Sequence, residues 1–493
     1  MSNVSTPAYV LRAAELALFA LVLGLLIAIP LARAAEAPRA PIEAVVDELV
    51  AEALAANLEL AVAGATVGER LAALDEARAA YRPVLDFDAR YTRADGGRTL
   101  ELPIGDLLNP VYATLNQLTG SGRFPSVQNQ VIDFQRSREQ ETKLSLTQPL
   151  YDARLGPRRA AAAANYDAAN ASRSALAARL ERDMRNAYYQ WLEARARGSI
   201  LDAAVELARE NQRVNESLFR NGKITRDLVF RAEADALEMQ QSQLAAQNAV
   251  VLAASYVNLL RNSRFDRALP LASVADEDIG RLKAALAAAT GSPALAFEPL
   301  ADGALRRRPE LRELDSELDA ASADERLARA AFRPRLALAV DAGTQGESYA
   351  LSQDDRYVLA SVLVKFNLWS GGADAAAVSG ARARASGARS SRSLAEQRIR
   401  LEVQQALQNL EVATASLSTA AKRVEAAAGA FRIAARKRDL GQINQAEFVD
   451  ARRVLTDAEL NQNVTRFSAL GSLADLSYAL GAGAAASHPD SLP

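Results

Sequence analysis

The chain has 493 residues, of which 49% are hydrophobic and 5% aromatic, and its 58 basic and 60 acidic residues give a net charge of −2. This balance excludes the basic surface expected of a nucleic-acid-binding protein, and the absence of cysteine excludes disulfides and thiolate sites. Few aromatic residues beside much alanine, leucine, arginine and glutamine favour long helices that pack through small side chains.

Residues 1–34 are predicted to be a signal peptide. Arg12 precedes an apolar run at 16–29, and an Ala-Arg-Ala cleavage pattern follows at 32–34. The run is shorter than the roughly 20 apolar residues that a spanning helix needs, so a membrane anchor is the less favoured alternative. No cysteine follows the cleavage pattern, which excludes lipid attachment there, and the mature chain is expected to begin near Ala35.

The mature chain is predicted to open with helices at 41–60 and 66–81. A proline at position 83 ends the second helix, and apolar and polar side chains then alternate at about 84–93, which indicates a strand. A second strand with the same alternation is predicted at 142–150. The segment 94–141 between them is predicted to be an ordered surface loop, to which no binding role is assigned.

Two very long helices are predicted next, at 155–220 and 225–261, joined at Gly222. The first would reach on the order of 100 Å. Its apolar residues recur at alternating steps of four and three, which predicts a coiled-coil seam with left-handed supercoiling. The predicted seam consists of Ile200, Ala204, Leu207, Asn211, Val214 and Leu218.

The whole order of elements then returns, which indicates a duplicated unit of domain size. An Ala-Ala-Tyr-Arg-Pro run at 79–83 returns as Ala-Ala-Phe-Arg-Pro at 330–334, and the turn at Gly222 returns at Gly441. The second copy has predicted strands at about 335–343 and 357–368, a shorter loop at 344–356, and long helices at 373–439 and 444–480. Its predicted seam consists of Val403, Leu407, Leu410, Thr414, Leu417, Ala421, Val424, Ala428 and Phe431.

The predicted domains follow the duplication: a first repeat at 35–263, a linker with one short helix at 264–303, a second repeat at 304–482 and a flexible tail at 483–493. The fold class is mainly α, with long coiled-coil hairpins and four strands per chain. Strands of about ten residues are long enough to cross a membrane when tilted. Four strands leave open edges, which lipid does not tolerate, so several chains are expected to share one barrel above a tube of helices.

In this arrangement the chain resembles the TolC-type outer-membrane efflux proteins over about residues 42–482. The resemblance rests on the duplication, the two glycine turns, Gln-Pro-Leu-Tyr-Asp at 148–152 and Asn-Leu-Trp-Ser-Gly-Gly at 367–372. It implies a homotrimer with a twelve-stranded barrel in outer-membrane lipid, set on a periplasmic α-helical barrel. It also implies a passive exit duct for drugs and other toxic small molecules, docked to a periplasmic adaptor (membrane fusion) protein and an inner-membrane transporter, with no cofactor.

The resemblance places the periplasmic aperture beside the glycine turns, and Gly222 and Gly441 at helix tips that contact the adaptor. Glu447 and Asp450 match acidic positions of the family and, three residues apart, share a helix face. In a trimer they would contribute six carboxylates near one axis, which favours cations. The alternative is a solvated face on which Glu447 caps the helix N-terminus.

The first copy departs from this acidic pattern. Asp227 and Arg231 occupy the corresponding region, and Arg231 stands where Asp450 stands in the second copy. Arg231 would pair with Asp450 or Glu447 across neighbouring hairpins and hold the aperture closed. An ordinary surface ion pair, worth under about 1 kcal/mol, is the alternative.

Other protein classes fit less of the sequence. A periplasmic coiled-coil tether explains the heptads but not the duplicated alternating strands. An enzyme would need reactive groups that the chain lacks, since its single histidine, His488, lies in the tail and no phosphate-binding glycine loop is present. Type I protein secretion uses the same kind of channel, and the sequence does not separate that use from small-molecule efflux.

Overall fold

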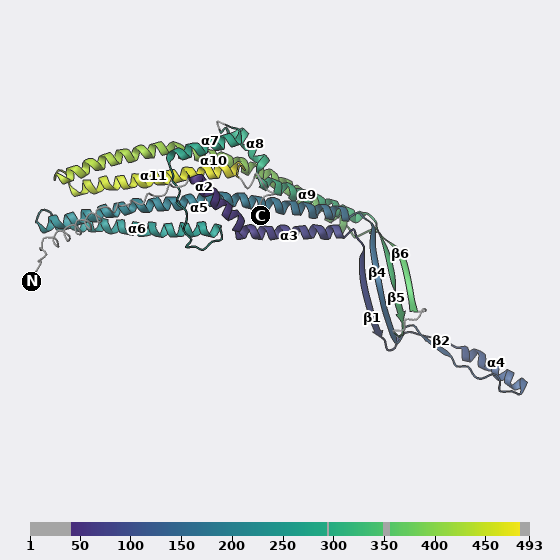
Figure 1. Cartoon of the computed structure of the whole chain (residues 1–493). Coiled ribbons are helices and arrows are strands. Elements are labelled where there is room, and N and C mark those ends of the chain that lie inside the picture. The colour runs from purple at the N-terminus through teal and green to yellow at the C-terminus, as the bar shows by residue number, and fades with distance from the viewer. Residues whose placement is uncertain (1–40, 293–294, 349–354, 484–493) are drawn as a thin grey trace, which may run out of the picture.

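The computed structural model describes residues 41–292, 295–348 and 355–483 (Figure 1). The predicted signal peptide and residues 484–493 of the predicted tail lie outside this part of the chain. The helices are α2 (Ile42–Ala56), α3 (Leu58–Ala79), α4 (Ile104–Thr119), α5 (Leu155–Arg220), α6 (Arg226–Leu260), α7 (Asp276–Thr290), α8 (Phe297–Arg307), α9 (Pro309–Arg329), α10 (Ala373–Asp439) and α11 (Gln445–Ala479), with a 3-10 turn at Ala330–Phe332. The strands are β1 (Val84–Arg93), β2 (Thr99–Leu102), β3 (Gln130–Asp133), β4 (Arg138–Asp152), β5 (Arg335–Gly346) and β6 (Arg356–Lys365).

Two long helical hairpins form the body of the molecule (Figure 1). Helices α5 and α6 make the first hairpin and α10 and α11 the second, and α5 packs against α11. The four helices therefore lie in the order α6, α5, α11, α10. Their turns gather at one end of the molecule and the four long strands extend from the other, as Figure 1 shows. The mainly helical fold with four long strands, predicted from the sequence, is confirmed.

The boundary between the first two helices differs from the prediction. The sequence placed it at 60–66, whereas α2 ends and α3 begins at Asn57. The Asn57 side chain accepts a hydrogen bond from the Leu60 amide at 3.1 Å and donates one to the Leu260 carbonyl at 2.9 Å. An asparagine N-cap satisfies a first-turn amide, so it starts a new helix without a proline or glycine to mark the position.

The segment between the two copies holds two helices, α7 and α8, where the sequence predicted a linker at 264–303 with one short helix. Pro299 was counted among the linker residues. It lies in the first turn of α8, where the missing amide hydrogen is not needed because first-turn amides have no partner within the helix. Helix α8 continues past the predicted end of the linker to Arg307.

The buried line of α5 keeps the predicted spacing but is shifted by one residue along most of its length. Of the predicted residues, Ala204 and Asn211 are buried, Ile200, Leu207 and Val214 are half-buried, and Leu218 is exposed. Helix α5 contacts both α6 and α11, so it buries a wider arc than a two-stranded coiled coil does. The residues buried along this stretch are Leu201, Ala204, Val205, Ala208, Asn211 and Asn215.

In α10 the buried line consists of alanine at every seventh residue. Val403, Leu407 and Leu410 are buried as predicted, but Thr414, Ala421 and Ala428 are only half-buried. Small side chains let neighbouring helices approach closely, so alanine occupies the line of closest contact and larger apolar residues flank it. The buried alanines are Ala406, Ala413, Ala420, Ala427 and Ala434.

The four long strands form an antiparallel sheet in the order β1-β4-β5-β6. One face carries polar groups such as the Arg90–Glu141 ion pair, whose Nη2 and Oε2 atoms lie 3.0 Å apart. The other face is apolar and open in the single chain, where Leu85 is 65% and Val358 76% exposed. This alternation is that of membrane strands with a lipid-facing side. One apolar row across the sheet consists of Leu85, Leu146, Val340 and Ala360.

Several strand ends differ from the prediction. Strand β4 begins four residues before the predicted 142–150, and β5 continues past the predicted 343 to Gly346. Both extensions occur because backbone pairing continues beyond the apolar residues, as in the pairing of Gln140 with Gly346. Strand β6 ends at Lys365 instead of 368, since its partner there is Arg335, the first residue of β5. The predicted loop at 94–141 contains its own two-stranded sheet, β2 and β3, and helix α4.

The largest apolar core lies where α5, α10 and α11 meet α2, α7 and α8. Tyr188 of α5 is fully buried there, donates a hydrogen bond to the Pro270 carbonyl at 2.8 Å, and accepts one from the Ala272 amide at 3.1 Å. Burial raises the pKa of Tyr188 to about 12, so its phenol stays protonated at physiological pH. This side chain fastens the segment after α6 to the long helix.

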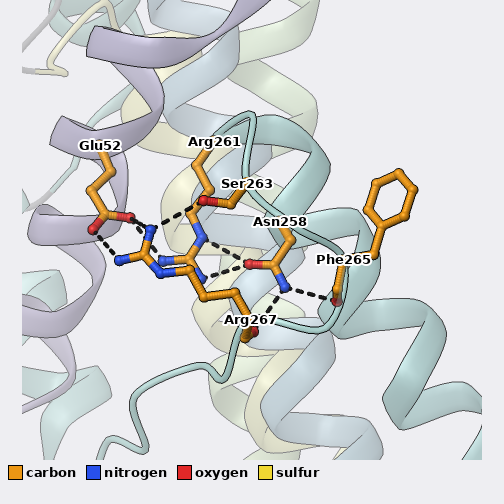
Figure 2. A network of polar contacts seen from close by, with 6 residues as sticks. All are labelled: Glu52, Asn258, Arg261, Ser263, Phe265 and Arg267. Atoms are coloured by element: carbon orange, nitrogen blue, oxygen red, sulfur yellow. Dashed lines mark hydrogen bonds and ion pairs between the residues drawn. The ribbon is translucent and has the colours of Figure 1, made fainter.

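A polar network fastens α2 to the end of α6 (Figure 2). Arg261 donates to Glu52 at 2.8 Å and Arg267 donates to the same carboxylate at 2.9 Å. Arg261 also donates to Asn258 Oδ1, whose amide in turn donates to the carbonyls of Phe265 and Arg267. The Arg261 side chain is only 2% exposed, so Glu52 supplies the charge that makes its burial tolerable.

Replacing Glu52 with glutamine is expected to lower stability by about 2 kcal/mol at neutral pH. Burial raises the pKa of Glu52, but hydrogen bonds from Arg261 and Arg267 outweigh it and hold the pKa below its ordinary 4.5. A lowered folded-state pKa contributes stability above the unfolded value, and that stability is lost as pH falls through the folded value. The difference in apparent Tm between Glu52→Gln and the parent chain should therefore shrink in acid. Equal effects of Glu52→Gln and the exposed control Glu48→Gln would contradict this role.

No single helix in the described part of the chain has the length and apolarity to cross a membrane. Helices α2 and α3 meet that criterion only when joined, and they are bent by 44° at their break. Val46 and Leu49 of α2 are buried in the core, so packing accounts for its apolar residues.

Candidate functional site at the hairpin tips

The two hairpin turns have the same backbone geometry. Gly222 and Gly441 have φ of 68° and 69°, a left-handed conformation that glycine adopts without strain. After each, an amide bonds back across the helix end, from Lys223 to the Leu218 carbonyl and from Gln442 to the Lys437 carbonyl. This is the Schellman arrangement, which ends the long helices sharply. Both turns lie at the end of the molecule opposite the strands (Figure 1).

Glu447 lies in the first turn of α11, in a reciprocal capping arrangement with Asn444. The Asn444 side chain accepts from the Glu447 amide at 2.9 Å and donates to the Glu447 carboxylate at 2.8 Å. The side chain that caps the helix N-terminus is therefore that of Asn444, and the Glu447 carboxylate contacts this cap. Glu447 and Asp450 are both exposed, so their carboxylates remain available to neighbouring copies, and the predicted ring of carboxylates stays a prediction.

Asp227 and Arg231 are exposed on the first turns of α6. Within the described residues of one chain, no hydrogen bond or ion pair joins Arg231 to Glu447 or Asp450. The predicted latch is thus not formed inside the chain, and its formation between copies stays a prediction.

A buried ion pair joins the two hairpins through other residues. Arg452 of α11 donates through Nη2 to Asp235 Oδ1 of α6 at 2.5 Å, and the two side chains are 3% and 9% exposed. Removing one member of such a buried pair leaves the other charge buried without compensation, at a cost of about 3–5 kcal/mol. This contact therefore holds the hairpins together near their tips.

Neighbouring amides extend this contact into what we call the tip polar cluster. Gln445 of α11 donates to Asn211 Oδ1 of α5 at 2.8 Å, and Asn215 donates to the Asn211 carbonyl at 2.7 Å. Asn211 and Asn215 are 1% and 3% exposed. The tip polar cluster consists of Asn211, Asn215, Asp235, Gln445 and Arg452.

Three atoms of the tip polar cluster are buried without a hydrogen-bond partner among the described residues: Asn211 Nδ2, Asp235 Oδ2 and Arg452 Nη1. Each unpaired buried polar atom costs about 1–3 kcal/mol relative to hydration. Contacts within the second hairpin are apolar instead: Phe448 is fully buried, with its ring 5.7 Å from Phe431. The second hairpin is therefore held near its turn by apolar packing, whereas the junction of the two hairpins is polar and incompletely satisfied.

The sequence contained one signal for this cluster. Asn211 was placed in the predicted seam among apolar residues, and a buried asparagine requires polar partners. The identity of those partners was not readable, because Asp235 and Arg452 are separated by more than 200 residues and meet only because α6 and α11 both pack against α5.

The family model for outer membrane efflux proteins matches residues 49–260 and 300–482, which is most of the chain. The chain belongs to the outer membrane efflux protein family. The resemblance derived from the sequence is thereby confirmed. The match leaves out residues 261–299, which contain α7.

Individual proteins agree with this membership. The pyoverdine export outer membrane protein OpmQ of Pseudomonas putida is 26% identical over 327 residues, which cover 65% of this chain and 67% of OpmQ. The outer-membrane channel OprN matches with a TM-score of 0.71 and 21% identity over 89% of this chain and 90% of OprN. The CmeC outer membrane channel of Campylobacter jejuni matches with a TM-score of 0.72 and 16% identity over 89% and 86% of the chains.

This efflux protein is a channel of the outer membrane whose helical hairpins lie in the periplasm. Members of the family work within tripartite efflux systems and are generally trimeric. The predicted localisation and the predicted role as an export duct are confirmed.

Proposed function

We propose that three copies of this chain form a passive exit duct for small molecules, fed by a periplasmic adaptor protein and an inner-membrane transporter. The repeats at 35–263 and 304–482 are its two units per chain, and the tips at Gly222 and Gly441 contact the adaptor. The main support for this assembly is that, in the single chain, both the sheet and the helical layer have uncovered edges. The duct performs no chemistry on its cargo.

The sheet supports this assembly through its two edge strands. Among the described strands, β1 and β6 each pair on one side only. Their free amide and carbonyl groups need partners, which lipid does not supply. Pairing β6 of one copy with β1 of the next closes the sheet, and three copies supply twelve strands, an even number within the range of bacterial barrels.

The helical layer supports it through two exposed apolar stripes, one on each outer helix. Both stripes repeat every seven residues, the spacing of a coiled-coil contact. If the tips of neighbouring copies are level, antiparallel packing of α6 against α10 brings Phe230 beside Ile433. The α6 stripe consists of Phe230, Leu237, Leu244 and Val251, and the α10 stripe of Val412, Ile433 and Leu440 with Thr419 and Ala426 between them.

The tip polar cluster supports a tip that is closed at rest and opens by separation of the two hairpins. Its unpaired atoms gain hydration when the hairpins part, which offsets some of the cost of breaking the Asp235–Arg452 pair. The adaptor would supply the remaining free energy by binding the separated tips better than the closed ones. The name of OpmQ, a pyoverdine exporter, supports small molecules as the cargo.

The assembly is tested by heat-sensitive gel electrophoresis of the detergent-extracted outer-membrane fraction, together with the native mass of the complex. A trimer in that fraction is expected. A periplasmic monomer or dimer would overturn the shared barrel and favour a coiled-coil tether.

Removing the carboxylates of Glu447 and Asp450 together is expected to lower the cation-to-anion permeability ratio at least about twofold in planar bilayers. The reason is that the trimer loses six negative charges near its axis. Glu277→Ala, which removes an exposed carboxylate from the first turn of α7, is the control and should leave the ratio unchanged. Unchanged selectivity in the double variant would refute the ring of carboxylates.

Replacing Arg231 with alanine is expected to raise the single-channel conductance of the resting duct, because Arg231 would pair with Asp450 or Glu447 of the neighbouring copy. One such exposed pair is worth under about 1 kcal/mol, so the increase should be small, and it should be smaller at high salt. Conductance equal to that of the parent channel at low salt would refute the latch.

A further inference from the structure

Helix α4 carries an exposed apolar stripe that no described residue of its own chain covers. Leu107, Val111 and Leu118 are 70%, 52% and 79% exposed, and Thr114, also exposed, lies between them. The four positions follow one another at steps of four, three and four, an average of about 3.7 residues, which places them on one face of the helix. An apolar face of this kind is what a helix buries when it packs against another element.

The opposite side of α4 is fastened to the segment that follows it, which fixes the direction of the stripe. Asn109 exchanges two hydrogen bonds with the backbone of Val127, at 2.9 and 2.8 Å. Asn116 does the same with the backbone of Phe124, at 2.7 and 3.1 Å. The rings of Tyr112 and Phe124 lie 5.6 Å apart on this side. The exposed stripe therefore faces away from its own chain and is held there by five inward contacts.

The position of α4 relative to the sheet brings equivalent helices of an assembly to one level. Strands β2 and β3 form a short stalk, and α4 projects from it beyond the end of the sheet that is remote from the hairpins (Figure 1). In a closed trimer the three stalks surround the outer mouth of the duct.

We propose that the three α4 helices of a trimer pack on one another through this stripe and form a cap over the outer mouth. The inference rests on the proposed trimer, because three stripes meet only if the copies share an axis. Each helix then buries apolar side chains that the single chain leaves in water.

A lipid surface is the other occupant to be considered, and the charge of α4 disfavours it. Helices that lie on membranes carry lysine and arginine on their polar face. Helix α4 has no basic residue, and Asp106 is its one charged side chain. Packing of α4 against another copy of α4 needs no basic residues, so a second copy is the favoured occupant of the stripe.

The absence of cysteine from the chain permits a direct test. Leu118→Cys and, separately, Val111→Cys are introduced into the full-length protein, and outer membranes are treated with a mild oxidant. Disulfide-linked dimers are expected from both variants, since two of three stripe cysteines in each trimer join. Gln117→Cys, exposed on the flank of α4, should remain unlinked.

A second disulfide pair keeps the failure of the cap distinct from the failure of the trimer. Phe230→Cys combined with Ile433→Cys reports contact between neighbouring hairpins in the proposed assembly. Linkage at this seam without linkage at positions 111 and 118 would overturn the cap and leave the duct standing. Linkage at neither place would overturn both. Labelling of Leu118→Cys by a thiol probe confined to the lipid phase would assign the stripe to the membrane instead.

Discussion

Replacing Asp235 with alanine is expected to loosen the tips and raise the conductance of the resting channel several-fold. The variant leaves the Arg452 guanidinium, whose side chain is 3% exposed, without its carboxylate between the hairpins. Such a loss costs about 3–5 kcal/mol, which exceeds the contribution of any exposed ion pair. Separation of the hairpins hydrates the arginine, so the variant favours the open tip. Single-channel recording in planar bilayers measures the change.

The chain provides a matched control for this experiment. Glu238 is three residues further along α6 and pairs with Arg453, at 3.5 Å, but both side chains are more than half exposed. Glu238→Ala should therefore change conductance little, because exposed pairs contribute under about 1 kcal/mol. Adding Arg452→Ala to Asp235→Ala should restore part of the lost stability, since the lone buried charge is removed. Equal conductance in Asp235→Ala and Glu238→Ala would show that the buried pair does not hold the tip.

Replacing Leu237 and Leu244 together with glutamate is expected to abolish the trimer. Both side chains are more than half exposed in the single chain, at 57% and 66%, so the fold of each copy should survive. In the assembly they would lie in the apolar contact between α6 and α10 of the next copy. Each trimer has three such seams and would bury six unpaired carboxylates, each costing several kcal/mol. Heat-sensitive electrophoresis and native mass report the loss.

Ala249→Glu is the control for the seam, because Ala249 is exposed on α6 but lies outside the stripe. It adds the same charge to the same helix and should leave the trimer intact. Persistence of the trimer in Leu237→Glu with Leu244→Glu would exclude this stripe as the contact between copies, whatever the sheet edges do.

Much of the fold was readable because its signals are local. The proline at position 83, the glycine turns at Gly222 and Gly441 and the change of apolar period each act within a few residues. Because the unit is duplicated, each weak motif occurs in both copies, which strengthens the prediction. The long helices α5 and α10 consequently lie where the sequence placed long helices, and β1 spans the predicted residues.

The predictions were wrong where tertiary packing, and not the local sequence pattern, sets a helix boundary or a buried face. Asn57 starts α3 by capping its N-terminus, which the apolar pattern does not indicate. Pro299 lies in the first turn of α8, where a proline does not interrupt the helix. The sequence predicts the seam of α10 at larger residues, whereas packing against the neighbouring helix buries the alanines beside them. Apolar period alone does not tell which of two adjacent lines lies closest to a neighbouring helix.

The sequence by itself determined the class of this protein: a duplicated, exported chain with two helical hairpins, four alternating strands and tips at two glycines. These features follow from apolar periods, turn residues and a sequence repeat, all of which can be recognised without knowing the tertiary contacts. Only the tertiary structure decided which residues hold the tips together and which apolar stripes remain uncovered. The Asp235–Arg452 pair, the seam stripes of α6 and α10 and the stripe of α4 depend on which face each helix turns to its neighbours. The buried face of each helix is determined by contacts between residues hundreds of positions apart, so it cannot be predicted from a short segment of sequence.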